Sequence, residues 1–134
     1  MINIKKELRK YATKERAKVN AWFFKTGKGQ YGEGDIFLGI TVPNVRKVVK
    51  LFFQPEADQP LAENIIDVAV ELLQSKYHEV RLAGCILMVE MFKLAMNNKN
   101  EKELKKIYKT YLKNTNRINN WDLVDVSCPS IVGI

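Results

Sequence analysis

Apolar residues recur every three or four positions along most of the chain, which is the spacing of one face of an α-helix. No segment alternates polar and apolar residues for long enough to predict a strand. The sequence therefore predicts an all-α fold. The expected elements are one long helix or two short ones over residues 4–24, then helices over 41–54, 60–73, 77–96 and 101–113, and a last helix that begins near residue 119 or 120.

Individual residues mark where these helices begin and end. Thr41 suits an N-cap, and Pro43 suits the first helical turn after it, where a missing N–H costs nothing. Pro55 ends that helix and Pro60 opens the next one. The helix at 77–96 is apolar almost all the way around, so neighbouring helices must cover it on several sides. We expect it to form the middle of the core.

A glycine-rich segment interrupts the helical pattern at residues 26–39, which hold five of the seven glycines and predict a loop. Within it, residues 27–32 match the G-x-G-x-x-G pattern of a dinucleotide site. That fingerprint needs a preceding strand and a following helix, whereas a helical pattern precedes it here, so we reject this interpretation. A loop that contacts nucleic-acid phosphates through Lys25 and Lys28 fits the segment better.

Several helices joined by short turns are consistent with a bundle or with a solenoid of stacked helix pairs. Residues 78–87 read HEVRLAGCIL, which resembles the second helix of a HEAT-type repeat, where a Val-Arg pair precedes small residues and a leucine. The expected fold is a set of antiparallel helix pairs stacked into a HEAT-like right-handed superhelix. A length of 134 residues and a hydrophobic content of 46% suit a single domain over residues 1–134.

Charge is unevenly distributed along the chain, whose overall net charge is +7. Residues 1–53 carry a net charge of +8, residues 54–98 a net charge of −4, and residues 99–134 a net charge of +3. An excess of basic residues favours anionic partners by a modest margin. Two basic stripes occur at helical spacing, one made of Arg46, Lys47 and Lys50, the other of Lys102, Lys106, Lys109 and Lys113.

The usual role of such a stripe is a solvated outer face. In a solenoid, however, the stripes would align along one surface and contact a phosphate backbone, each contact adding to a salt-dependent affinity. Lysine suits phosphate contacts that ignore base sequence, whereas base reading favours Arg, Asn or Gln. The candidate DNA-binding residues are Lys25, Lys28, Arg46, Lys47, Lys106, Lys109 and Lys113.

The sequence excludes several other kinds of site. His78 is the only histidine, which rules out a catalytic triad or a histidine-rich metal site within the chain. Cys85 and Cys128 lie far apart and lack the close pairs of zinc sites, so we expect no metal, no disulfide and no cofactor. The apolar run at 80–96 is broken by charges and too short to span a bilayer, and the N-terminus lacks a signal-peptide pattern. We expect a reduced, cytoplasmic protein that makes no membrane contact and acts as a monomer.

Residues 119–129, NNWDLVDVSCP, place an aromatic and an acidic residue on one predicted helix. Trp121 and Asp125 are four apart, so on a helix they project from the same face one turn apart. The simpler interpretation is a core Trp and an acid near a helix N-terminus, where the helix dipole favours an anion. A second spaced motif, FLGITVPNVR at residues 37–46, favours the functional interpretation.

The two segments resemble the W-D-x-V-D-x-x-x-P and F-L-G-I/V-x-x-P-x-x-R motifs of the AlkD-like DNA alkylation repair glycosylases, in the same order. The resemblance implies HEAT-like repeats that bind alkylated double-stranded DNA and hydrolyse the N-glycosidic bond of cationic N3- or N7-alkylpurines. It implies that Asp125 stabilises the oxocarbenium-like sugar and orients water, and that the indole of Trp121 packs on the sugar. The base leaves without entering a deep pocket.

Members of that family usually continue into further helix pairs, which supply a second DNA-facing Trp and an Arg. The resemblance therefore implies that residues 1–134 correspond to the N-terminal part of the family architecture, or to a shortened relative with weak DNA affinity and slow turnover. Two alternatives remain open. One is a non-catalytic helical-repeat module that binds the DNA backbone or a protein partner, and the other is a protein–protein scaffold that does not bind DNA.

Overall fold

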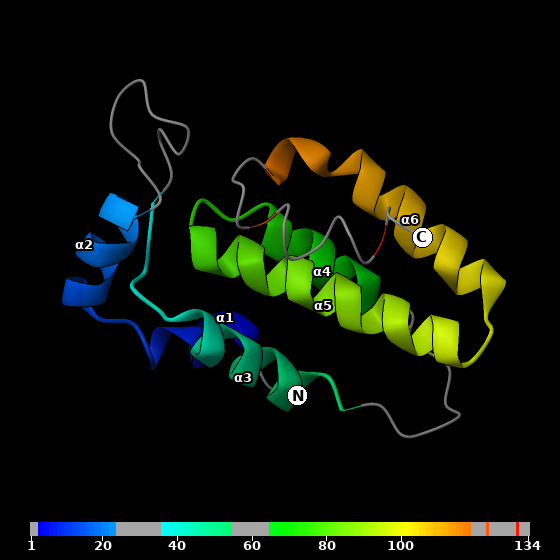
Figure 1. The fold of residues 1–134 in the computed structure, drawn as a ribbon, viewed down its shortest axis with the longest axis horizontal. Helices are drawn as coiled ribbons and strands as arrows, with labels where there is room; N and C mark the ends of the chain where they lie inside the picture. Colours follow the sequence, from blue (N-terminus) through cyan, green and yellow to red (C-terminus); the bar gives the residue numbers. More distant parts are fainter. Residues whose placement is uncertain (1–2, 24–35, 55–64, 119–122, 124–130, 132–134) are drawn as a thin grey trace.

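Figure 1 shows the computed structural model of the chain, which describes residues 3–23, 36–54, 65–118, 123 and 131. These residues form helices and no strand, with one isolated bridge between Ile36 and Tyr77. The all-α prediction is confirmed. The elements are α1 (Ile4–Arg9), α2 (Lys14–Phe23), α3 (Val42–Phe52), α4 (Ile65–Leu73), α5 (His78–Asn97), α6 (Glu101–Lys113) and the short 3-10 helix η1 (Thr115–Arg117).

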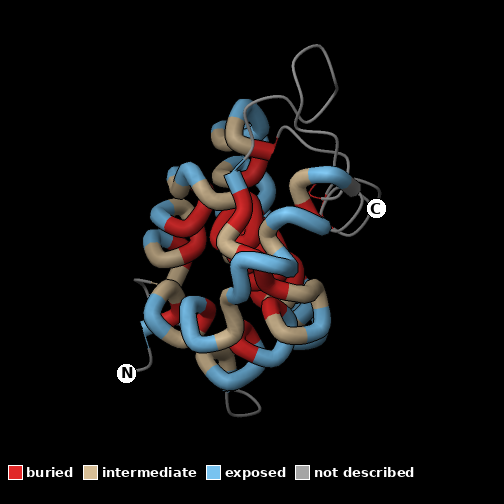
Figure 2. Tube along the Cα trace, turned by 90° about the vertical axis from the view of Figure 1, so that its left-hand side faces the viewer, coloured by how far each residue is buried: buried red, intermediate tan, exposed pale blue. Residues whose placement is uncertain are grey.

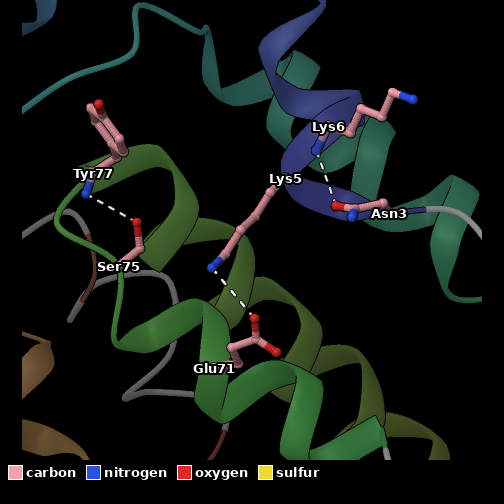
Figure 3. Close-up of polar contacts among 6 residues, drawn as sticks. All are labelled: Asn3, Lys5, Lys6, Glu71, Ser75 and Tyr77. Carbon is pink, nitrogen blue, oxygen red and sulfur yellow. Dashed lines mark hydrogen bonds and ion pairs between the residues drawn. The ribbon is translucent and has the colours of Figure 1, made fainter.

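The N-terminal helical stretch is two short helices and not one long one. α1 begins after Asn3, whose side chain accepts a hydrogen bond from the backbone N–H of Lys6 at 3.1 Å (Figure 3). The break before α2 lies at Thr13, whose backbone N–H donates to the carbonyl of Gly39 at 3.0 Å. The Thr13 hydroxyl also accepts a hydrogen bond from the Arg16 N–H at 3.1 Å, so a local N-cap and a contact with the 37–40 segment together mark where α2 begins.

The apolar face that the sequence predicts over this stretch holds in α1 but not in α2. Ile4 and Leu8 are buried in the core, whereas Val19 is 50% exposed. Among the α2 residues whose burial the structure describes, 14–22, only the polar Asn20 is buried.

The helices α3 and α4 follow the sequence prediction where the structure describes them; Pro55 and Pro60, the predicted end of α3 and start of α4, lie outside the described residues. α3 begins after Thr41, whose hydroxyl accepts a hydrogen bond from the Asn44 N–H at 3.4 Å, and Pro43 lies in its first turn. In α4, the exposed residues Asp67 and Glu71 point away from the interior. The core-facing residues of the two helices are Val45, Val48, Val49, Ile66, Ala69, Leu72 and Leu73.

The helix α5 is the centre of the molecule, as its apolar sequence predicts. It packs against α3, α4 and α6, and residues 78–89 are buried without interruption (Figure 2). Gly84 allows α4 to approach closely, because a Cβ at this position would lie 3.1 Å from the carbonyl oxygen of Ala69. Covering α5 on several sides is what its all-round apolar surface requires.

Two arginines stabilise the turn that joins α4 to α5. The Arg81 Nη1 donates to the carbonyl of Ser75 at 3.0 Å, and the Arg117 Nη2 donates to the same carbonyl at 3.3 Å. Arg117 also donates through Nε to the carbonyl of Leu73 at 3.2 Å. These bonds satisfy carbonyl groups that the end of a helix leaves without intrahelical partners. They also attach η1, which follows α6, to the α4–α5 pair.

The ion pair between α1 and α4 contributes little to stability. Figure 3 shows the Lys5 ammonium 3.5 Å from the Glu71 carboxylate, with the Lys5 and Glu71 side chains 45% and 73% exposed. Exposed ion pairs of this kind contribute on the order of 0 to 1 kcal/mol. α1 is held instead by its packing against α3, with Ile4 and Leu8 in the apolar cluster that includes the buried valines of α3.

Candidate nucleic-acid interface

The predicted site residues fall into three groups: four outside the described residues, two on α3 and three on α6. Trp121, Asp125, Lys25 and Lys28 lie outside the described residues. Arg46 and Lys47 lie on α3, and the remaining three lie on α6: Lys106, Lys109 and Lys113.

Arg46 lies at a hollow of about 550 Å³ between α3 and the C-terminal half of α5. Lys50 from α3 and Lys93 from α5 line it as well. Among the described residues, neither Arg46 nor Lys50 has an acidic side-chain partner, whereas Lys93 lies 3.9 Å from Glu90. The hollow therefore carries more positive than negative charge. Its apolar lining comes from Val49, Phe53, Ile86 and Leu94.

Lys47 does not join Arg46 at this hollow. Its ammonium lies 5.7 Å from the centre of the Tyr11 ring, next to the end of α1. The helical step of about 100° per residue separates the directions of neighbouring side chains in this way. A cation over an aromatic face is attracted by the ring quadrupole, so Lys47 is already engaged within the chain.

The α6 lysines form the basic ridge that the sequence predicts. Lys106, Lys109 and Lys113 are exposed, and the buried residues Ile107 and Tyr111 lie on the other side of the helix. Beside the ridge lies a second hollow, of about 730 Å³, with Lys102 and Lys105 in its lining. The other lining residues are Phe92, Glu101, Leu104, Tyr108 and Ile131.

The two basic groups do not meet within the described residues. α5 lies between α3 and α6 and packs against both (Figure 1). The sequence analysis missed Lys93, which interrupts the apolar pattern of α5 and joins the α3 group only in three dimensions. The signal in the sequence was that interruption itself, a charged residue in a run of core residues.

The first turn of α5, at the opposite end of the helix from Lys93, holds a buried carboxylate that the sequence analysis did not single out. Glu79 is 1% exposed, and its Oε2 accepts hydrogen bonds from the Gly39 N–H at 2.7 Å and the Ile40 N–H at 3.0 Å. Its Oε1 accepts from the Leu38 N–H at 2.8 Å, and Oε2 also accepts from the Asn20 side-chain amide at 3.3 Å. A carboxylate with this many donors meets the requirement that buried charge be paired or hydrogen-bonded.

The FLGI segment at residues 37–40 thus joins α2, α3 and α5. Phe37 packs on His78, with the ring centroids 4.8 Å apart. Gly39 adopts a positive φ of 93°, and a Cβ there would lie 1.9 Å from the carbonyl oxygen of Thr13. A side chain at this position would collide with the start of α2, so the close approach requires glycine.

Other kinds of site were also sought in the described part of the chain. It contains no cluster of three or more His, Cys, Asp or Glu side chains that would hold a metal ion. No described helix is both long enough and apolar enough to cross a bilayer. His78 and Cys85 are both buried in the interior.

Comparison with known proteins identifies one family. The model of the family described as DNA alkylation repair enzyme matches residues 4–134. That range contains every candidate site residue, including Trp121 and Asp125. No curated protein and no solved structure matches the chain.

Proposed function

The chain belongs to the DNA alkylation repair enzyme family, and we propose that it is a DNA glycosylase that removes cationic N3- or N7-alkylpurines from double-stranded DNA. The observation that carries the proposal is the family match over residues 4–134, which spans both motifs. In this proposal Asp125 and Trp121 perform the chemistry. The protein acts as a monomer in the cytoplasm and needs no cofactor.

The proposal requires Trp121 and Asp125 to share the outer side of one helix. Leu123, midway between them, is in helical conformation and fully buried. Each helical step is about 100°, so the positions two before and two after a buried residue both turn away from the core by about 160°. The burial of Leu123 therefore supports an outward-facing pair.

The chemistry follows from the charge of the substrate. Alkylation at N3 or N7 gives the purine a positive charge and makes it a good leaving group. The bond between the sugar C1′ and the base nitrogen breaks, and the base departs as a neutral molecule. The sugar that remains is oxocarbenium-like, and a nearby carboxylate stabilises this cation. Water then forms a bond to C1′, and Asp125 orients the water and accepts its proton.

Binding rests on the basic surfaces of α3 and α6. Arg46 and Lys50 have no acidic partner within the described segments, so no internal ion pair is lost when a phosphate binds there. Lys106, Lys109 and Lys113 provide further exposed cations along α6. Each phosphate neutralised by Lys or Arg releases condensed counterions, so the affinity falls as salt rises.

Base release from duplex DNA containing 7-methylguanine tests the proposal. The protein should release the base, and Asp125→Asn should slow the release about 100-fold, the order found when one electrostatic contributor to a transition state is removed. Asp67→Asn is the matched control, because Asp67 is an exposed acid on α4. The proposal fails if the unaltered protein releases no base, or if the two Asn variants are equally active.

A non-catalytic helical-repeat module that binds DNA is the second candidate, and the basic hollow at Arg46 and Lys50 is the observation that favours it. It predicts salt-dependent DNA binding that survives both Trp121→Ala and Asp125→Ala, with no base release. A scaffold for proteins alone predicts no DNA retention even at low salt.

A further inference from the structure

Trp22 is the most exposed of the large hydrophobic residues that the structure describes, with 81% of its surface accessible. It lies in the last turn of α2, and Val19, 50% exposed, lies one turn before it. A single exposed apolar residue is ordinary and needs no explanation. An exposed indole is less ordinary, because burying a large apolar side chain stabilises a fold by about 1.5 to 3 kcal/mol.

Three exposed cations and one exposed acid share α2 with this indole. Lys14, Arg16 and Lys18 on α2 are all exposed, and none of them has an ion-pair partner in the described segments. Glu15 is the one acid on α2. Lys18 precedes Trp22 by four residues, which places the two on the same side of the helix, about 6 Å apart along its axis.

The fold holds this face outward. Asn20, two residues before Trp22, is buried on the opposite side of α2. Its side-chain amide donates to the carbonyl of Ile40 at 3.1 Å and to Glu79 at 3.3 Å. Gly39 brings the loop backbone against the first turn of α2, where a Cβ would lie 2.6 Å from the Ala17 nitrogen. Trp22 is therefore presented by an anchored helix.

We propose that this face of α2 binds an unpaired base of a DNA strand, with the indole of Trp22 stacked on the base and Lys14 and Lys18 on the adjacent phosphates. The proposal rests on the proposed function for the identity of the polymer. Aromatic side chains next to a basic track are how proteins bind single strands without reading sequence, since every base offers a π-face. Lysine supplies the phosphate contacts.

The charges argue against a second copy of this chain as the occupant. A two-fold dimer through Trp22 would bring Lys14, Arg16 and Lys18 of both copies into one interface. Like charges placed opposite each other oppose association. A polyanion removes that repulsion, and an unpaired base also covers the indole.

Trp22 fluorescence tests the proposal directly. The chain contains two tryptophans, so Trp121→Phe leaves Trp22 as the single reporter. An oligothymidylate should quench its emission, whereas an abasic deoxyribose-phosphate oligomer of the same length should bind without quenching. Equal quenching by both polymers, or no quenching by oligothymidylate, overturns the proposal.

Affinity supplies the second measurement. Trp22→Ala should weaken oligothymidylate binding about tenfold, the loss expected from one base–aromatic stack. Met96→Ala is the control. Met96 is 44% exposed and lies at the C-terminal end of α5, so its substitution should leave the affinity unchanged. Unchanged affinity of Trp22→Ala overturns the proposal, as does a dimer that dissociates on this substitution in analytical ultracentrifugation.

The two proposals fail separately. Base release from methylated duplex by the unaltered protein reports on the glycosylase and needs no stacking at Trp22. Quenching of Trp22 by oligothymidylate needs no chemistry at Asp125. Quenching without base release leaves the α2 surface standing and removes the glycosylase, and base release without quenching does the reverse.

Discussion

The helices α5 and α2 are held in place by different kinds of contact. α5 is held by apolar packing against α3, α4 and α6, with residues 78–89 buried in succession. α2 exposes most of its side chains and is held by polar and backbone contacts at Thr13, Asn20 and Gly39. The free energy that fixes α5 is spread over many contacts, whereas α2 depends on a few.

This difference predicts different consequences of damage. Losing one apolar contact of α5 lowers the stability of the whole core, because that packing is continuous. Losing one polar contact of α2 loosens this helix locally, since local segments open with free energies well below the global value. A helix secured in this way leaves its outer face available for a partner.

The largest effect is expected from Gly39→Ala. The Cβ would lie 1.9 Å from the Thr13 carbonyl oxygen, and the backbone φ is positive. We expect a loss of about 4 kcal/mol in the free energy of unfolding, measured by urea denaturation, because the clash displaces residues 38–40, whose N–H groups donate to the buried Glu79 carboxylate of α5. Gly84→Ala is the comparison: its neighbours at 3.1 Å must shift by only a few tenths of an ångström, and alanine favours a helix by about 1 kcal/mol, so its loss should be clearly smaller. Equal losses for the two variants would contradict this account of Gly39.

A somewhat smaller effect, about 3 kcal/mol, is expected from Leu87→Ala in α5. Leu87 is fully buried in the central cluster, so the substitution leaves a cavity that its neighbours fill only in part. Amide hydrogen exchange should accelerate in α3, α4, α5 and α6 together. Faster exchange confined to α5 would show that the core does not unfold as one unit.

The smallest and most local effect is expected from Glu79→Gln, about 2 kcal/mol. The substitution replaces one carboxylate oxygen by an NH2 group, so either the Leu38 N–H, or the Gly39 and Ile40 N–H groups, lose their acceptor. Exchange should accelerate in α2 and at residues 38–40, while α6 keeps its protection. Glu90→Gln serves as the control, because the Glu90 side chain is 43% exposed. Uniform acceleration across all helices would refute the local attachment of α2.

The sequence predicts most of the fold because the signals involved are local. Thr41 and Pro43 mark the start of α3, and the apolar surface of α5 predicts its central position. The sequence left one long helix or two short ones open over residues 4–24: Thr13 caps α2 locally through the Arg16 N–H, but its hydrogen bond to Gly39, 26 positions away, cannot be predicted from local signals. The role of Glu79 was hidden for the same reason, since its partners are backbone groups that any residue carries.

The candidate site is predicted less completely. The α6 ridge follows from helical spacing alone and has the orientation expected from it. The hollow at Arg46 depends on α3 meeting α5, so Lys93 could not be assigned to it from the order of residues. Trp121 and Asp125 lie outside the described residues, and their pairing on one helix face stays a prediction.

The central position of α5 also sets a minimum reach for any anion that engages both basic surfaces. A helix with its side chains is about 10 Å wide, and α5 stands between the α3 and α6 lysines. An isolated phosphate can occupy one side or the other but cannot bridge them. A charged polymer laid across α5 contacts both basic surfaces. The separation of these surfaces therefore favours extended anionic ligands over small anions.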